Sequence, residues 1–304
     1  MTSFSIVGAG RLGTALAFAL TRKGWDLAVI ADGDAAAARE SRRIVGRGRA
    51  TGEIRRAAGG AGILFICVPD DAVEAVAGTL SRSGGEWPGR IVFHTSGLLP
   101  AAALEALRRK GARVASLHPV QSFPSKKGGG RLFRGIFWGL EGDRDAVRLG
   151  REVARALGGR SVVLREKDKP LYHAACSLAS NAFLSLEATA AALLREAGVS
   201  EKSAAAALML LVKGTLRNVK KLGMEKSLTG PVVRGDVRTV RSHLEALKFH
   251  PLEGEIYRAL GKQALGLITE RNIPAHKVRA LRLLLEGKRL PLRASRRTSR
   301  RRVP

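Results

Sequence analysis

The chain has little cysteine, few aromatic residues and a shortage of acidic side chains. Its 304 residues include two cysteines, Cys67 and Cys176, and both lie in apolar runs. Two such thiols exclude a disulfide-stapled scaffold and suit a reducing compartment, so we expect a cytoplasmic protein. Aromatic residues make up only 5% of the chain, which is thin for a surface that stacks nucleic-acid bases.

The sequence also lacks a long hydrophobic run. Outside the N-terminus the longest clean apolar stretch is 204–212, whereas a membrane helix needs about 20 residues. The apolar N-terminal stretch is broken by Arg11 and three glycines, which does not fit a signal peptide. We therefore predict no membrane segment, and the hydrophobic fraction of 45% is enough for a packed core.

Positive charge is what the chain has in excess. The formal net charge is +27, and residues 288–304 hold eight Lys and Arg with no acid. A segment of this composition buries too little apolar surface to fold, so we predict a disordered basic tail. Weak nucleic-acid binding through this tail is compatible with its charge, but the tail alone does not establish such a partner.

Short apolar strands alternate with helical stretches in the first half of the chain. The predicted strands are 3–8, 26–31, 62–68, 90–95 and 112–117, with two further pieces at 136–140 and 161–164. This alternation predicts an α/β domain, in which a doubly wound parallel sheet of the Rossmann type is covered on both faces.

The pattern changes near residue 166, and no convincing strand follows. The predicted helices are 170–197, 201–220, 234–248, 253–271 and 274–286. We therefore expect three parts: a Rossmann-type domain over 1–165, an all-helical domain over 166–287, and the basic tail over 288–304.

A glycine motif follows the first predicted strand. Gly8, Gly10 and Gly13 form GxGxxG, with Arg11 and Leu12 between the last two glycines. In a strand–turn–helix context these glycines allow a tight turn, the approach of a pyrophosphate and close helix–strand packing. The helix N-terminus then offers N–H groups to the phosphates. We predict a dinucleotide site made by these five residues.

The choice between NAD and NADP stays open in the sequence. Asp32 follows the second strand, and an acid there accepts hydrogen bonds from ribose hydroxyls, which favours NAD. Arg39, Arg42 and Arg43 follow soon after and would suit a 2′-phosphate, although they also read as a solvated helix face.

Ligand-facing residues gather at the carboxyl ends of three predicted strands. They are Val68 and Pro69 beside the cofactor, and His94, Ser96, His118 and Gln121 for the substrate. Carboxyl ends of parallel strands share one edge, where ligands of α/β proteins bind. A structural role in turns is the alternative for either histidine.

The helical half adds further polar candidates. His173, Ser177 and Asn181 follow one another at i, i+4 and i+8, which places them on one face of an apolar helix. Arg234 lies in a turn that opens another helix and suits a substrate carboxylate. We predict no metal site, because the histidines and cysteines lack ligand spacing.

Six blocks together resemble a known family. VGAGRLGTAL, CVPDDAV, HTSG, LHPVQSFP, KPLYHAACSLASN and LTGPVVRGD occur in the order typical of bacterial Rossmann-like oxidoreductases with a helical C-terminal domain of long-uncharacterised function. That family is related to pyrroline-5-carboxylate reductase, to ketopantoate reductase and to proteins with a 6-phosphogluconate dehydrogenase C-terminal-like domain. The resemblance implies an NAD(P)-dependent enzyme and a homodimer.

The resemblance also assigns roles at the first helix after the Rossmann domain. Related dehydrogenases carry Lys-x-x-x-Asn there; Asn181 matches the asparagine, while Ser177 stands at the lysine position. Serine is a poor general acid. We therefore expect His118 or His173 to donate the proton, with Lys169 a weaker candidate, and Asn181 and Ser177 to orient the substrate.

Three functions compete at this point. The first is NAD(P)H-dependent reduction of a small 2-oxo acid, with ketopantoate as the leading substrate. The second is imine reduction of the pyrroline-5-carboxylate type, which needs less acid catalysis. The third is a non-catalytic dinucleotide sensor or nucleic-acid-binding protein, against which the polar residues at the sheet edge argue.

Overall fold

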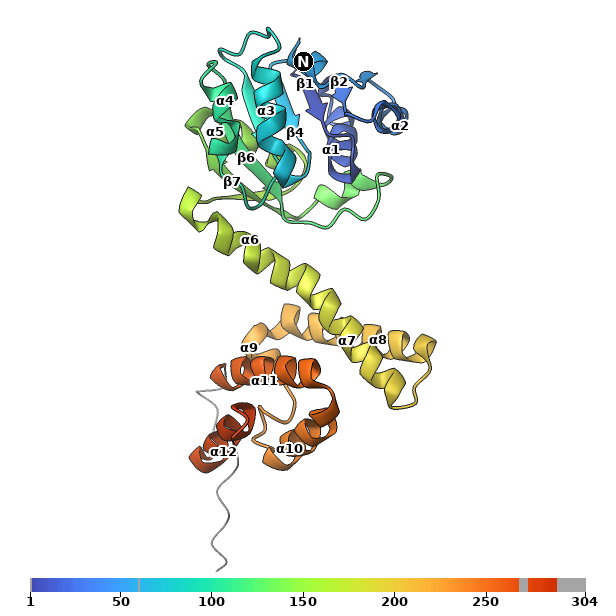
Figure 1. Cartoon of the computed structure of the whole chain (residues 1–304), viewed down its shortest axis with the longest axis vertical. Helices are drawn as coiled ribbons and strands as arrows, with labels where there is room; N and C mark the ends of the chain where they lie inside the picture. Colours follow the sequence, from blue (N-terminus) through green and yellow to red (C-terminus); the bar gives the residue numbers. More distant parts are fainter. Residues whose placement is uncertain (1, 60, 268–272, 289–304) are drawn as a thin grey trace, which may run out of the picture. The chain divides into compact units, whose positions relative to one another are not determined.

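The computed structural model describes residues 2–59, 61–267 and 273–288. Backbone contacts divide the chain into two compact units, Met1–Phe183 and Leu184–Pro304 (Figure 1). The predicted basic tail lies outside the described residues apart from Lys288.

The first unit is built on one eight-stranded sheet. The strands are β1 (Ser3–Val7), β2 (Asp26–Ala31), β3 (Arg49–Thr51), β4 (Ile63–Ile66), β5 (Ile91–His94), β6 (Arg113–Pro119), β7 (Phe137–Gly142) and β8 (Arg160–Val163). Their order in space is β3-β2-β1-β4-β5-β6-β7-β8. This confirms the predicted Rossmann-type sheet and adds β3, which at three residues is too short to show a pattern in the sequence.

One pair of strands departs from the expected parallel arrangement. Strand β7 runs antiparallel to β6, with His118 opposite Gly139, while β8 is parallel to β7. A parallel neighbour needs a crossover, usually a helix. The connection 120–136 contains only a short 3₁₀ turn, so the chain turns back along β6, and the sheet is mixed rather than fully parallel.

Helices cover both faces of the sheet. In the first unit they are α1 (Arg11–Arg22), α2 (Ala35–Val45), α3 (Val73–Ser81), α4 (Glu105–Arg108), α5 (Arg144–Ala156) and α6 (Lys169–Ser177). Short 3₁₀ segments are η1 (Ile54–Ala58), η2 (Asp70–Ala72), η3 (Ala101–Leu104), η4 (Gly129–Phe133) and η5 (Glu166–Asp168).

The strand pleat divides the buried core in two. Alternate strand residues such as Phe4 and Phe65 pack with α1 and α5 on one face, whereas Val7 and Leu64 pack with α3 on the other. Both faces are therefore apolar, as a sheet with helices on each side requires. The polar side chains of the strands therefore lie mainly at the strand ends, where the candidate active site described below is found.

The second unit is helical, as predicted, and no strand occurs in its described residues. After α7 (Phe183–Glu196), which crosses the unit boundary, come α8 (Glu201–Leu222), α9 (Met224–Ser227), α10 (Val237–Ala246), α11 (Pro251–Gly266), α12 (Ala275–Leu285) and the 3₁₀ segment η7 (Leu247–Phe249). Asp236 caps α10 by accepting a hydrogen bond from the Thr239 N–H. The predicted end of the 253–271 helix falls partly outside the described residues.

The predicted helix over 170–197 is interrupted. Between α6 and α7 lies a π turn, η6 (Leu178–Ala182), which inserts one residue relative to an α-helix. The whole helical stretch Glu166–Glu196 is long and apolar enough, by length and composition alone, to cross a membrane, and its most apolar window is not buried. We did not foresee this from the sequence. A single such helix is weak evidence for a membrane span.

Candidate active site at the carboxyl edge of the sheet

The glycine motif forms a tight loop with one open position. Gly8 has φ +99°, and a Cβ at Gly13 would lie 1.9 Å from the Gly8 carbonyl oxygen. By contrast, a Cβ at Gly10 would meet nothing within 4 Å. Backbone conformation at position 8 and close backbone packing at position 13 therefore require glycine, whereas Gly10 leaves free space before the N-terminus of α1.

The free space lies at the N-terminus of α1. Gly10 is the N-cap and has no side chain to accept from the first N–H groups, and the first turn holds no acidic residue. Arg11 is exposed and Leu12 half-buried. An uncapped helix N-terminus with a positive dipole end is a seat for an anion. The motif residues therefore fit the pyrophosphate of a dinucleotide.

Asp32 ties the end of β2 to this loop. One carboxylate oxygen accepts a hydrogen bond from the Ala9 N–H at 2.7 Å, and the other accepts from the Asp34 N–H at 2.9 Å. Val68 borders the loop from β4, because a Cβ at Gly8 would lie 3.1 Å from Val68 Cγ1. Pro69 follows and is exposed. Asp32 thus holds the loop in place, whatever it also contributes to a ribose.

His94, the last residue of β5, and Ser96, in the loop that follows, are both buried. His94 Nε2 lies 3.0 Å from the Pro100 carbonyl oxygen, and its Nδ1 accepts from the Ser96 N–H. The Ser96 hydroxyl accepts from the N–H groups of Leu98 and Leu99. Burial and Lys169 lower the pKa of His94 to about 4. The side chains of both predicted substrate residues therefore already make hydrogen bonds within this segment.

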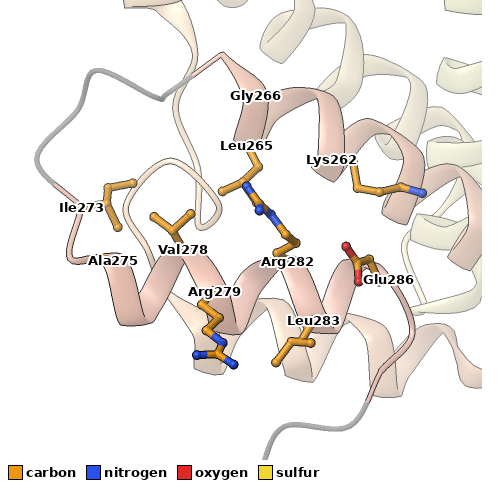
Figure 2. A pocket seen from close by; sticks show the side chains of 10 residues that line it. All are labelled: Lys262, Leu265, Gly266, Ile273, Ala275, Val278, Arg279, Arg282, Leu283 and Glu286. Carbon is orange, nitrogen blue, oxygen red and sulfur yellow. The ribbon is translucent and has the colours of Figure 1, made fainter.

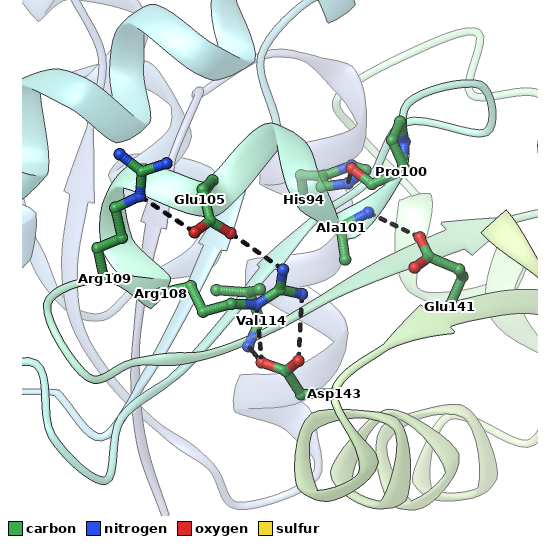
Figure 3. Close-up of polar contacts among 9 residues, drawn as sticks. All are labelled: His94, Pro100, Ala101, Glu105, Arg108, Arg109, Val114, Glu141 and Asp143. Carbon is green, nitrogen blue, oxygen red and sulfur yellow. Dashed lines mark hydrogen bonds and ion pairs between the residues drawn. The ribbon is translucent and has the colours of Figure 1, made fainter.

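Carboxylates from β7 and the residue after it fix the next part of the same segment. Glu141 accepts from the Ala101 N–H at 2.6 Å, and burial raises the pKa of this carboxyl. Asp143 pairs with Arg108 at 3.1 Å and accepts from the Val114 N–H. Figure 3 shows these contacts fastening the chain after β5 to the neighbouring strands.

His118 and His173 come together over Gly97. Their rings are 5.9 Å apart and nearly perpendicular. A Cβ at Gly97 would lie 2.6 Å from His173 Cδ2 and 3.0 Å from His118 Nε2. The Tyr172 hydroxyl lies 2.8 Å from His118 Nδ1. The first turns of α6 thus bring His173 to the end of β6, as the sequence led us to expect for a shared site.

Lys169, the weaker candidate in the sequence, is buried at the same edge. Its side chain is 1% exposed, and Nζ donates to Ser116 Oγ at 2.7 Å and lies 3.5 Å from the Ser96 carbonyl oxygen. Burial lowers the pKa of Lys169 to about 8, although Glu141 and Asp70 act in the opposite direction. Buried lysines without a contacting carboxylate are rare and typical of functional sites.

The remaining predicted site residues are Ser177, Asn181, Gln121 and Arg234. Ser177 and Asn181 are exposed, and the π turn interrupts the expected i, i+4, i+8 stripe between them. Gln121 is exposed and donates to the Leu132 carbonyl. Arg234 belongs to the second unit. Their predicted substrate contacts stay predictions.

A separate hollow of about 810 Å³ lies in the second unit between α11 and α12. Figure 2 shows Arg282 reaching from α12 toward Leu265 of α11. The lining of this hollow includes Lys262, Arg279 and Glu286 but none of the predicted site residues. Across the described ranges of the chain, no cluster of three or more His, Cys, Asp or Glu side chains is suited to a metal ion.

Family models match both parts of the chain. Residues 1–119 match a Rossmann-like domain, and residues 136–264 match a domain of unknown function, DUF2520. The chain is thus a Rossmann-like domain followed by a DUF2520 region, which confirms the resemblance in the six sequence blocks. The DUF2520 match begins at β7, so this family region includes the last two strands as well as the helices.

Solved structures share this fold. Protein TM1727 from Thermotoga maritima is 27% identical, with a TM-score of 0.69, over 87% of this chain and 98% of that one. A putative NADP oxidoreductase from Bacteroides fragilis is 23% identical, with a TM-score of 0.71, over 89% and 98%. A pyrroline-5-carboxylate reductase from Coxiella burnetii is 18% identical, with a TM-score of 0.57, over 88% and 98%. A search of curated proteins found no match.

Proposed function

We propose that the chain is an NAD(P)H-dependent oxidoreductase that reduces a small substrate carrying a carboxylate. One observation carries this proposal. The open position at Gly10 before α1 and the His118–His173 pair over Gly97 occur on the same carboxyl edge of one sheet. In α/β proteins this edge is where the cofactor and the substrate bind together.

We propose NADPH as the preferred form of the cofactor. Both oxygens of Asp32 already accept backbone N–H groups, which weakens the case for a carboxylate reserved for the ribose diol of NAD. Arg39, Arg42 and Arg43 are exposed on α2, beyond Asp32. Among the structural neighbours, a Plasmodium falciparum pyrroline carboxylate reductase has NADP bound and an Aspergillus terreus reductive aminase is in complex with NADPH.

The leading substrate class is a 2-oxo acid, with ketopantoate as the first compound to test. When bound, the reduced nicotinamide would supply a hydride to the carbonyl carbon. His118 and His173 are the side chains proposed to meet the carbonyl, with Asn181 and Ser177 to orient the substrate. Lys169 places a positive charge beneath this edge, which favours an anionic substrate over a neutral one.

Imine reduction is the alternative, and one observation favours it. Burial, His173 and Lys169 lower the pKa of His118 to about 4, so an imidazolium at this position is scarce near neutral pH. A substrate whose nitrogen arrives protonated has no need of such an acid. Imine reductases and pyrroline-5-carboxylate reductases are also among the proteins that share the fold.

We further propose that the protein is a cytoplasmic homodimer. Large apolar side chains are exposed on α8, where Leu210 and Leu211 are 70% and 67% exposed. A second copy of the same helix would remove this surface from water. The two cysteines are unpaired, as expected in a reducing compartment. Analytical ultracentrifugation should show a dimer that Leu210→Glu disrupts and that Lys213→Glu, on the same helix, leaves intact.

A substrate screen tests the proposed activity. The purified chain is mixed with NADPH or NADH and with a panel of 2-oxo acids, including ketopantoate, and cyclic imines. Loss of nicotinamide absorbance with one class identifies the reaction, and the two cofactors compared at equal concentration give the preference. If the chain binds neither cofactor, the proposal is wrong.

A further inference from the structure

The contact between Tyr172 and His118 links the tautomer of the ring to the hydroxyl of the phenol. The Tyr172 hydroxyl lies 2.8 Å from His118 Nδ1. Burial, with Cys176 close by, raises the pKa of Tyr172 above its usual value, so the phenol keeps a proton to donate. A hydroxyl that donates to Nδ1 makes this nitrogen an acceptor, and a neutral ring then holds its proton at Nε2.

The other ring nitrogen faces the site. A Cβ at Gly97 would lie 3.0 Å from His118 Nε2, and the His173 ring borders the same place. Within the residues that the structure describes, no hydrogen-bond partner is recorded for His118 Nε2. His118 Nε2 is not among the buried side-chain atoms that lack a partner, so it is accessible from the site and available to a ligand.

We propose that His118 meets the substrate through the N–H of Nε2, and that Tyr172 is the positioning residue that holds the ring in this tautomer. The inference rests on the proposed reductase function and refines it. A donor at this point needs an acceptor on the substrate. A carbonyl oxygen has lone pairs for this bond, whereas a protonated imine nitrogen has none, so the substrate class is a carbonyl compound.

The charges around His118 keep the ring in its neutral form. Lys169, Tyr172 and His173 face it from α6, and His94 faces it from β5. None of these groups is an acid that would stabilise an imidazolium. Glu141 accepts from the Ala101 N–H, and its charge acts on the pKa of Lys169. The pKa of His118, lowered to about 4, agrees with this arrangement.

A neutral His118 ring would act on the reaction by stabilising the negative charge that develops on the substrate oxygen. Hydride addition to the carbonyl carbon leaves a negative charge on the oxygen, and the Nε2–H bond is strongest at this stage. His118 keeps its own proton, because losing it would leave an anionic ring. The proton that completes the alcohol comes from water, which leaves hydroxide. A neutral histidine used as an electrophile in this way is a known pattern.

Nitrogen NMR of the histidine rings tests the inference on the whole chain without substrate. In ¹⁵N-labelled protein near neutral pH, we expect His118 to show a pyrrole-type Nε2 and a pyridine-type Nδ1. Tyr172→Phe should remove the tautomer preference and lower kcat by about 3- to 10-fold, with KM for the cofactor unchanged, as for the loss of one neutral hydrogen bond.

A matched control exists in the second unit. His243 Nδ1 lies 2.8 Å from the Tyr257 hydroxyl, so Tyr257→Phe makes the same chemical change elsewhere and should leave the His118 signals and kcat unchanged. A His118 proton on Nδ1 in the wild-type protein, or a doubly protonated ring at pH 7, would overturn the inference. So would unchanged ring signals in Tyr172→Phe.

These readouts separate the inference from the proposed function. If the expected tautomer is found and no carbonyl compound is reduced, the function fails and the role of Tyr172 in fixing the ring stands. If a 2-oxo acid is reduced by a chain whose His118 carries its proton on Nδ1, the function stands and the inference fails. Lys169→Met should raise the pKa of His118 in the same spectra, and an unchanged pKa would contradict the role given to the surrounding charges.

Discussion

Two histidine–tyrosine pairs in different units have almost the same internal geometry. His118 and Tyr172 have a 2.8 Å contact and rings at 89°, and His243 and Tyr257 have a 2.8 Å contact and rings at 87°. Their surroundings differ. His118 lies among Gly97, His173 and buried Lys169, whereas His243 is exposed on α10.

The comparison shows that a histidine–tyrosine contact alone does not define a candidate active site. The same contact on a helix surface orients a ring in water, where its proton exchanges freely with solvent. At the end of β6 the contact acts on a ring that is mostly withdrawn from water and faces a second histidine. Under the proposed function, burial and the neighbouring charge let this hydrogen bond act on the protonation of His118.

The largest expected effect comes from the glycine loop, which only the first unit contains. Gly10→Val should abolish binding of both nicotinamide cofactors at concentrations that saturate the wild type, because its side chain enters the open space before α1. The melting temperature should stay close to that of the wild type. Gly62→Val is the control, since a Cβ there also meets nothing within 4 Å. Fluorescence titration with retained cofactor affinity would refute the loop assignment.

Next in size is the loss of each histidine of the two pairs. His118→Asn should lower kcat by about 10²- to 10³-fold, the typical cost of removing a donor to a developing oxyanion. His243→Asn should leave kcat within experimental error. Steady-state kinetics with the substrate found in the screen measures both. Equal effects on kcat in the two variants would contradict the different roles given to the two histidines.

A smaller effect is expected at Asp32. Because its carboxylate holds the Ala9 N–H of the loop, Asp32→Ala should weaken NADH and NADPH alike, by about 1.5–3 kcal/mol for a hydrogen bond to a charged group. Calorimetric titration with each cofactor measures the two losses. A loss confined to NADH would instead assign the carboxylate to the ribose diol.

The last prediction is a pH dependence of stability. The folded-state pKa values of His94 and His118 are lowered to about 4, below the value of about 6.5 in an unfolded chain. Between these values the unfolded chain binds more protons, so stability is full above about pH 6.5 and falls as the pH drops toward 4. Urea unfolding at several pH values should show this slope, and His118→Asn should reduce it. A slope that His118→Asn leaves unchanged would contradict the lowered pKa.

The sequence predicts most of the fold because the evidence is local. Buried strands such as 62–68 have a continuous apolar pattern, and the glycine motif marks the first strand–helix turn. What the sequence does not predict depends on distant contacts or on small changes of register. The reversal of β7 follows from a connection without a crossover helix, and the π turn at 178–182 has no distinctive residue pattern.

The site shows the same limit. His118 and His173 were expected at a shared edge because strand ends and the next helix meet there. The weight of Lys169 was missed, since a lysine at the start of a helix usually points to solvent and its burial against Ser116 depends on packing. Tyr172 gave one usable signal: it directly precedes His173 on a helix facing the sheet edge.

Gly97 limits which side chains its own position can hold. The main chain itself touches the place where the His118 and His173 rings converge, and even a methyl group would displace them. No side chain at position 97 is therefore available to adjust substrate preference. A saturation library at position 97 should return glycine alone among active clones.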